Sequence, residues 1–205
     1  MDVSCIILAG GKSTRLGRNK VVEKIGNQSL IEIVVSRLSA LESDIIIVAS
    51  KDSSLPQLTN CPRLKLANDI YPGRGSLGGI YTGLIASETL FNLVVACDMP
   101  FLNLDLLQYM VDRTEGYDAV IPKSDVDILE PLHAVYSKNC IPAIESLIKK
   151  DRFSILELYP LIKVKYIEYS EVERFDPDHL SFFNINTEED LRVGKELLRR
   201  ESKSD

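Results

Sequence analysis

The hydrophobic positions of the chain alternate between two spacings, which predicts strands alternating with helices. Continuous apolar runs at residues 3–9, 44–50 and 93–100 are typical of strands covered on both faces of a parallel sheet. Between the first two runs, apolar residues recur three and four positions apart from Leu30 to Leu41, as in a helix. Strand, helix and strand in this order form a βαβ unit.

The same alternation continues to the end of the chain. Residues 117–122 and 132–137 read as strands, 137–150 contain a helix, and 163–169 alternate like an edge strand. Asn103 can cap a helix that runs to about residue 114, and Thr187 with Asp190 predicts a capping box for a last helix. We therefore expect a three-layer αβα sandwich with a mostly parallel sheet. Ligands of such sheets bind beyond the carboxyl ends of the strands.

Composition and charge narrow the class of protein. A chain of 205 residues with 45% hydrophobic content suits a single domain, which we expect over residues 1–200 with a disordered tail at 201–205. The net charge of -6 argues against nucleic-acid and anionic-membrane partners. No signal peptide or membrane span is visible, and the four cysteines form no C-x-x-C pair. These features predict a cytoplasmic protein with reduced thiols. We expect a monomer or a weak homo-oligomer.

The first predicted strand opens into a loop from Leu8 to Lys20 with three glycines and four basic residues. Glycines let backbone N–H groups approach an anion, and the side chains of Lys12, Arg15, Arg18 and Lys20 can offset triphosphate charge. The GKST segment resembles the end of a P-loop, but that motif requires glycine at position 6, where this chain has Ile6. The loop therefore predicts a different phosphate site, the alternative being a basic surface turn.

Asp98 follows the third apolar run directly before Met99 and Pro100. A carboxylate at the carboxyl end of a central strand can hold Mg²⁺, which prefers oxygen ligands and bridges them to substrate phosphates. A turn or helix-capping aspartate is the alternative.

Two further segments carry candidate ligand-binding residues. Asp69 precedes a glycine-rich stretch that includes Gly78, where backbone can lie against a base while the carboxylate accepts from ribose or base donors. A flexible surface loop is the alternative there. Asn184 and Asn186 are two residues apart, so they share one side of a predicted strand and could bind a ligand. The alternative is a strand end that only leads into the capped helix. His133 and His179 are weaker signals, since either fits a packed or surface histidine.

Taken together, four motifs resemble the molybdenum cofactor guanylyltransferase family, the MobA-like nucleotidyltransferases. They are LAGGKSTRLGRNK, GRGSLGGI, ACDMPFL and FFNINTEEDL, in that order over most of the chain. The resemblance implies a Rossmann-like sheet of the nucleotide-diphospho-sugar transferase type and the transfer of GMP from GTP to molybdopterin-type cofactor, with Mg²⁺ as the metal. The LAGG form is associated with guanine, whereas the sister cytidylyltransferases tend to carry LAAG.

The resemblance also assigns roles to residues. It implies that the nucleotide and metal site consists of Leu8, Ala9, Gly10, Gly11, Lys20, Asp69, Gly78 and Asp98, with Asp98 on Mg²⁺. Asn184 and Asn186 fall where the family handles the pterin substrate or the metal. Arg15, Lys20 and Asp98 are the expected catalytic residues, acting by positioning and charge rather than as nucleophiles. The alternatives are a nucleotidyltransferase for CTP or a sugar phosphate, and a non-catalytic nucleotide-binding module.

Overall fold

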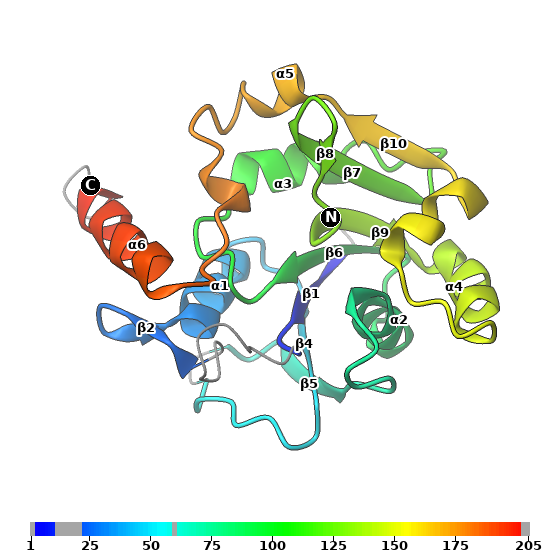
Figure 1. Cartoon of the computed structure of the whole chain (residues 1–205), viewed down its shortest axis with the longest axis horizontal. Coiled ribbons are helices and arrows are strands. Elements are labelled where there is room, and N and C mark those ends of the chain that lie inside the picture. Colours follow the sequence, from blue (N-terminus) through cyan, green and yellow to red (C-terminus); the bar gives the residue numbers. More distant parts are fainter. Residues whose placement is uncertain (1–2, 11–21, 59–60, 202–205) are drawn as a thin grey trace.

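The computed structural model describes residues 3–10, 22–58 and 61–201 of the chain. Their central sheet has the strand order β10-β7-β9-β6-β1-β4-β5, with β8 paired to β7 (Figure 1). The sheet strands are β1 (Val3–Leu8), β4 (Ile45–Ala49), β5 (Leu64–Asn68), β6 (Phe91–Ala96), β7 (Ala119–Asp125), β8 (Ile128–Leu129), β9 (His133–Ser137) and β10 (Val164–Ile167). A small hairpin joins β2 (Lys24–Ile25) to β3 (Gln28–Ser29).

Most of the sheet is parallel, as the sequence predicts. β1 pairs in parallel with both β4 and β6, and β4 pairs in parallel with β5. β9 is antiparallel to both of its neighbours, β6 and β7. The chain builds outward from β1 to β5 on one side and then returns to place β6 on the other side of β1. Strand order therefore reverses between β1 and β6, where an open α/β sheet forms its ligand crevice.

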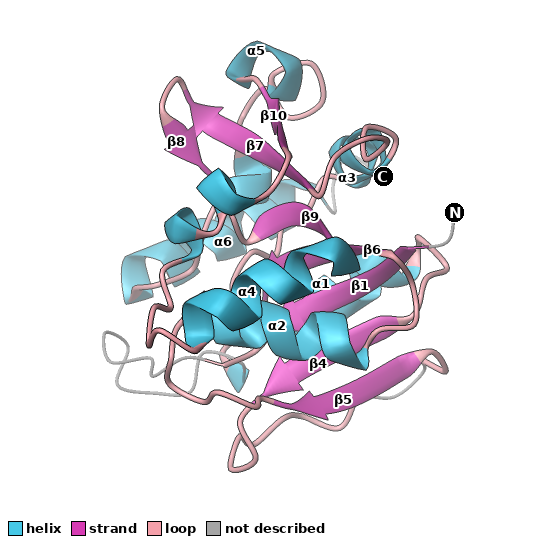
Figure 2. Cartoon of the chain, turned by 90° about the vertical axis from the view of Figure 1, so that its right-hand side faces the viewer, coloured by secondary structure: helices cyan, strands magenta, loops and turns pink. Residues whose placement is uncertain are grey.

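Helices cover both faces of this sheet (Figure 2). The helices are α1 (Leu30–Ser39), α2 (Ser76–Ala86), α3 (Leu104–Val111), α4 (Ile141–Ile148), α5 (Tyr169–Val172) and α6 (Glu188–Glu201). Alternate residues of β1 face opposite layers: Cys5 and Ile7 pack with α1 and α3, whereas Ile6 packs with α2 and α4. This two-sided burial explains why the buried strands read as continuous apolar runs.

Glycines set the distance between α2 and β1. A Cβ atom on Gly83 would lie 2.5 Å from Cγ2 of Ile6, and one on Gly79 would lie 3.2 Å from Cδ2 of Leu8. A larger residue at either place would push the helix away from the strand. The glycine-rich segment, predicted as a loop leading into a helix, therefore continues as the helix itself.

Both predicted caps are present. The Asn103 side chain accepts a 2.9 Å hydrogen bond from the N–H of Leu106, although α3 ends at Val111 rather than near residue 114. At α6, Thr187 Oγ1 accepts from the N–H of Asp190 at 3.1 Å, and the Asp190 carboxylate accepts from the N–H of Thr187 at 2.8 Å. Side chains thus satisfy helix N–H groups that have no partner within the helix.

The structure differs from the sequence-based expectations at one edge of the sheet and near the last helix. β5 was not expected, because this edge strand is mostly exposed and lacks an apolar run. The segment of Asn184 and Asn186 is not a strand: a 3-10 turn at Leu180–Phe182 leads into irregular backbone. α6 extends to Glu201, and residues 202–205 of the predicted tail lie outside the described residues. Among the described residues, each helix is too short or too polar to cross a bilayer.

Candidate active site

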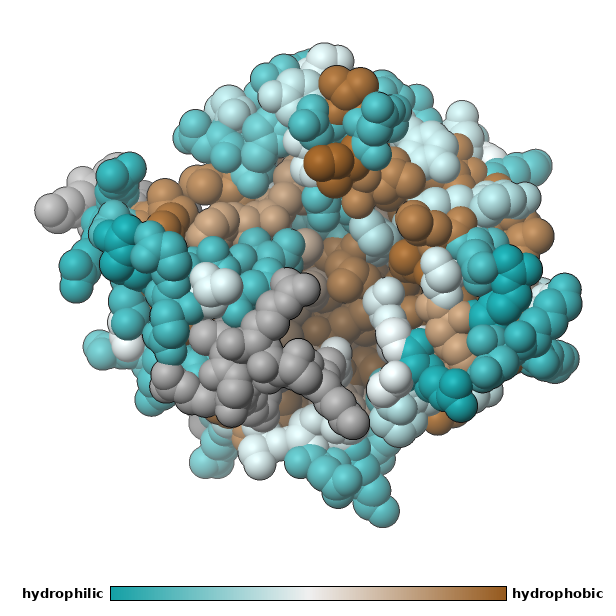
Figure 3. Space-filling view, viewed as in Figure 1, coloured by the Kyte–Doolittle hydropathy of each residue, from teal (hydrophilic) through white to brown (hydrophobic). Residues whose placement is uncertain are grey.

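The carboxyl ends of β5, β4, β1 and β6 lie side by side along one edge of the sheet. Asp69 follows β5 directly, while Gly10 and Asp98 each stand two residues beyond β1 and β6. Figure 3 looks onto the face where these strands end, and this face is hollowed near its middle over hydrophobic residues. The predicted residues from three distant stretches of sequence therefore gather at the edge where strand order reverses.

Asp69 is held in a fixed position at this edge. Its Oδ1 accepts a 3.0 Å hydrogen bond from the N–H of Tyr71 and lies 3.3 Å from the hydroxyl of Thr82, in α2. Its own N–H donates to the carbonyl of Ala49 at 2.8 Å, which continues the parallel ladder beyond β5. As far as the described residues are concerned, these contacts leave Oδ2 as the carboxylate oxygen that can accept a hydrogen bond from a ligand.

Gly10 faces that second oxygen. A Cβ atom on Gly10 would lie 3.8 Å from Oδ2 of Asp69. β1 and β5 are two strand positions apart, or about 10 Å at the usual spacing, so the Asp69 side chain reaches back across β4 toward Gly10. An exposed glycine backbone beside a carboxylate offers a ligand both an N–H donor and an anionic acceptor.

Leu8 and Ala9 are buried, unlike Gly10. The carbonyl of Leu8 accepts from the N–H of Cys97 at 3.2 Å, and the N–H of Ala9 donates to the carbonyl of Val48 at 2.8 Å. Because these backbone groups belong to the sheet and the Leu8 side chain packs on Gly79, both residues form the wall behind the site.

Close packing of α2 against Tyr71 requires glycine at position 78. A Cβ atom there would lie 2.9 Å from Cβ of Tyr71, so α2 and the Tyr71 backbone can approach each other only at a glycine. Its carbonyl also accepts a 3.0 Å hydrogen bond from the Thr82 hydroxyl. Gly78 thus brings the first turn of α2 against the loop that follows Asp69.

Asp98 and the C-terminal motif meet directly. The N–H of Ile185 donates a 3.0 Å hydrogen bond to the backbone carbonyl of Asp98, and Ile185 is fully buried. Asn184 and Asn186, on either side of Ile185, are half-buried, as is Asp98 itself. The side-chain amide of Asn184 donates to the carbonyl of Phe182 at 3.1 Å, which orients its oxygen. Sequence analysis predicted both asparagines but not the buried isoleucine that anchors them.

These residues suit a magnesium ion bound together with phosphates. Among the described residues, no three His, Cys, Asp or Glu side chains gather closely enough to hold a metal ion alone. Mg²⁺ usually keeps several water ligands and takes one or two protein carboxylates plus substrate phosphates. The half-buried Asp98, two residues beyond the end of β6, offers one carboxylate of that kind.

Several predicted residues lie outside the described part of the chain. These are Gly11, Lys12, Arg15, Arg18 and Lys20. Their phosphate-binding and catalytic roles therefore stay predictions.

Sequence analysis missed Thr82 and Tyr71, which fix Asp69. A signal for Thr82 exists, because a threonine inside an otherwise apolar helix needs a nearby polar partner. For Tyr71 no such pattern is present, since its contact with Asp69 is made by the backbone.

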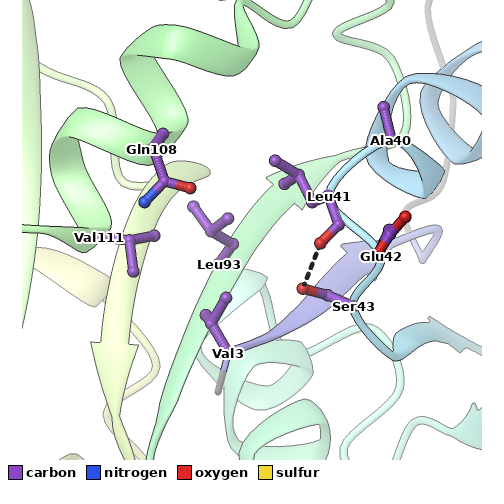
Figure 4. Close-up of a pocket in the computed structure, with 8 residues that line it drawn as sticks. All are labelled: Val3, Ala40, Leu41, Glu42, Ser43, Leu93, Gln108 and Val111. Carbon is purple, nitrogen blue, oxygen red and sulfur yellow. Dashed lines mark hydrogen bonds between the residues drawn. The ribbon is translucent and has the colours of Figure 1, made fainter. Parts of the chain in front are cut away.

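A cavity of about 240 Å³ lies at the opposite edge of the sheet (Figure 4). It is lined by Val3 at the start of β1, by residues that follow α1, and by Gln108 and Val111 of α3. None of the predicted site residues lines it. This cavity is therefore separate from the candidate active site.

The MobA-like NTP transferase domain matches residues 5–162 of the chain. The chain belongs to the MobA-like NTP transferase family. This family is one of nucleotidyltransferases, and the match includes the described candidates Gly10, Asp69 and Asp98 but ends before Asn184.

Individual relatives extend the match to the whole length. The chain is 38% identical to a probable molybdenum cofactor guanylyltransferase of Peptoclostridium acidaminophilum, over 97% of this chain and 90% of that protein. Among solved structures it is similar to molybdopterin-guanine dinucleotide biosynthesis protein A of Archaeoglobus fulgidus, with a TM-score of 0.82, 28% identity, and coverage of 96% and 99% of the two chains. The resemblance seen in the four motifs is thereby confirmed.

More distant members of the fold are also recognisable. The 2-C-methyl-D-erythritol 4-phosphate cytidylyltransferase of Thermus thermophilus matches with a TM-score of 0.72 at 15% identity, covering 97% of this chain and 100% of that chain. The predicted αβα fold of the nucleotide-diphospho-sugar transferase type is confirmed.

Proposed function

We propose that this chain transfers GMP from GTP to the phosphate of a molybdopterin-type molybdenum cofactor and releases pyrophosphate. The observation that carries the proposal is the gathering of Gly10, Asp69 and Asp98 at one edge, at the point where strand order reverses. Relatives named molybdenum cofactor guanylyltransferase support the choice of nucleotide and acceptor.

The sheet edge formed by the carboxyl ends of β5, β4, β1 and β6 would bind the two substrates in two halves. On the β5 side, the second carboxylate oxygen of Asp69 would accept hydrogen bonds from the nucleoside, and the backbone N–H of Gly10 would donate one to it. On the β6 side, Asp98 and the neighbouring Asn184 and Asn186 would bind the acceptor's phosphate where it meets the α-phosphate of GTP. The triphosphate then lies across the ends of β1 and β6.

The reaction needs no protein nucleophile. An oxygen of the acceptor phosphate attacks the α-phosphorus in line, the bond to the bridging oxygen breaks, and pyrophosphate leaves with the electron pair. Mg²⁺ held by Asp98 would supply charge neutralisation for the phosphates. The chain's own contribution is to hold two anions in reactive geometry, with Arg15 and Lys20 as the cations proposed to stabilise the developing charge.

A panel of nucleotides tests this proposal. GTP with Mg²⁺ should raise the melting temperature more than ATP, CTP or UTP does, because ligands that bind only the folded state stabilise it. Pyrophosphate release should then require both GTP and the molybdenum cofactor. Preference for CTP, or release with a sugar phosphate, would assign a sister nucleotidyltransferase activity. Binding without release under any acceptor would identify a non-catalytic module.

A further inference from the structure

The loop between Asp69 and α2 is held from outside the site by the segment that follows α4. This loop, residues 70–75, carries Tyr71 and Arg74 and contains Gly73 and Gly75, whose φ angles are 77° and 80°. Left-handed glycines make a loop easy to form and also easy to deform. Its conformation in the absence of nucleotide therefore depends on contacts made by its side chains.

Two of those contacts involve Phe153. The guanidinium of Arg74 lies over the Phe153 ring, 5.2 Å from its centroid, and the ring of Tyr71 lies 6.0 Å from it at an angle of 56°. Arg74 also donates to the Asp151 carboxylate at 2.9 Å. The N–H of Arg74 donates to the carbonyl of Tyr71 at 3.1 Å, so the two loop residues move as one turn.

The segment that carries Asp151 and Phe153 is held to the end of α4 by backbone hydrogen bonds. The N–H of Asp151 donates to the carbonyl of Ile148 at 2.9 Å, and the N–H of Arg152 donates to the carbonyl of Leu147 at 3.0 Å. Leu147 is buried in the core between α4 and the sheet. Asp151 and Phe153 therefore project from a rigid helix end.

From these contacts we propose that Asp151 and Phe153 are positioning residues for the nucleoside half of the site. They hold Arg74 and Tyr71, and the N–H of Tyr71 in turn holds Oδ1 of Asp69. This inference rests on the proposed function, because it concerns the same nucleoside subsite. Neither residue touches the nucleotide; each acts through the loop.

The exposed ion pair alone would contribute little, since Arg74 and Asp151 side chains are 56% and 76% exposed. The contacts of the Phe153 ring contribute more, because the attraction between tilted aromatic rings and the cation–π attraction persist at a partly buried ring. Removing Phe153 should therefore loosen the loop more than neutralising Asp151 does.

Two measurements on Phe153→Ala test the inference. Without nucleotide, amide exchange at Tyr71 and Arg74 should accelerate about fivefold, while exchange within β7 stays unchanged. The dissociation constant for GTP should rise by about the same factor, and kcat at saturating GTP should stay within about twofold. Phe153→Tyr keeps the ring and should restore both values.

Arg152→Ala is the matched control. Arg152 lies between the two positioning residues but pairs with Glu157 and not with the loop. Arg152→Ala should leave both the amide exchange of the loop and the affinity for GTP unchanged. If Phe153→Ala lowers global stability, Asp151→Asn and Arg74→Ala test the same attachment of the loop, because each alters an exposed side chain of the ion pair between the loop and this segment.

Unchanged amide exchange in Phe153→Ala would overturn the inference, and so would faster exchange with unchanged GTP affinity. If the wild-type protein bound no GTP, the proposed function would fail. The exchange comparison needs no nucleotide and would still decide whether Phe153 holds the loop.

Discussion

The N–H of Ile185 donates a 3.0 Å hydrogen bond to the carbonyl oxygen of Asp98. Ile185 is fully buried in a small cluster with Ile25, Leu30, Ile33 and Leu191. The C-terminal motif is thus anchored on one side in a hydrophobic cluster and on the other beside the candidate metal ligand. Asn184 and Asn186 thereby gain a fixed position beside Asp98, in the half of the site proposed for the acceptor.

Replacing Asn184 with alanine should impair the acceptor half of the reaction. We expect kcat/KM for the molybdenum cofactor to fall about tenfold or more, because a fixed polar group at the reacting phosphates is lost. The KM for GTP should change little. Asn139→Ala, an exposed asparagine after β9 at the other edge, is the control. Equal loss in both variants would contradict a role for Asn184 at the site.

Gly83→Ala should destabilise the protein although alanine favours helices. The gain in helix propensity is about 1 kcal/mol, whereas overpacking a core costs about 1–3 kcal/mol. The added Cβ would lie 2.5 Å from a side-chain atom of the fully buried Ile6, so the upper part of that range applies. Denaturant unfolding should show a net loss of about 2 kcal/mol. Gly79→Ala should lose less, because the end of the Leu8 side chain can move; equal losses would be inconsistent with this packing.

Sequence patterns predicted the buried parts of the fold best. β1, β4 and β6 are buried on both faces, so their apolar runs are unambiguous. The sequence pattern does not predict β5, because β5 is an edge strand whose Leu66 is 66% exposed. Its position is set by pairing with β4, a long-range contact that leaves no periodic pattern in the sequence.

For the candidate site, the sequence singled out individual residues but not the side chains that hold them in place. Asp69 and Asp98 follow strands that are distant in sequence, and parallel strand order brings their ends to one edge. Thr82, Ile185 and Phe153 act through contacts with backbone or with other side chains. Such contacts depend on how helices and loops pack, which local sequence does not encode.

Cys61 should react with thiol reagents faster than the other three cysteines do. Burial raises the pKa of the Cys5 thiol to about 12, and burial also raises the pKa of Cys140 to about 12. Cys97 is buried as well, whereas Cys61 is partly exposed. Because the thiolate is the reactive form, a disulfide reagent at pH 8 should modify Cys61 rapidly and the others only after unfolding. Cys61→Ser should abolish the fast phase; a remaining fast phase would contradict the burial of the other three.

Stability should fall in mild acid because of His133. Burial lowers the pKa of His133 to about 3 from its ordinary value of 6.5, and neither ring nitrogen has a hydrogen-bond partner among the described residues. At pH values between about 3 and 6.5, the His133 ring is therefore protonated in the unfolded chain and neutral in the folded protein. Stability is complete above about pH 7 and falls as the pH drops, by about 2 kcal/mol at pH 5.

His133→Leu isolates this contribution. The variant lacks the titrating ring, so its loss of stability between pH 7.5 and pH 5 should be smaller than that of the wild type by about 2 kcal/mol. Unfolding in urea at the two pH values measures the difference. An identical pH dependence in both proteins would show that the histidine is not buried in its neutral form.

Pyrophosphate release by Asp98→Asn tests the proposed chemistry most directly, with GTP, Mg²⁺ and the molybdenum cofactor all at saturating concentration. Asp105→Asn, an exposed aspartate in the first turn of α3, is the control. We predict that Asp98→Asn folds with an unchanged melting temperature and loses turnover about a hundredfold or more, whereas Asp105→Asn keeps it. Wild-type turnover in a folded Asp98→Asn protein would remove Asp98 from the reaction and contradict the proposed site.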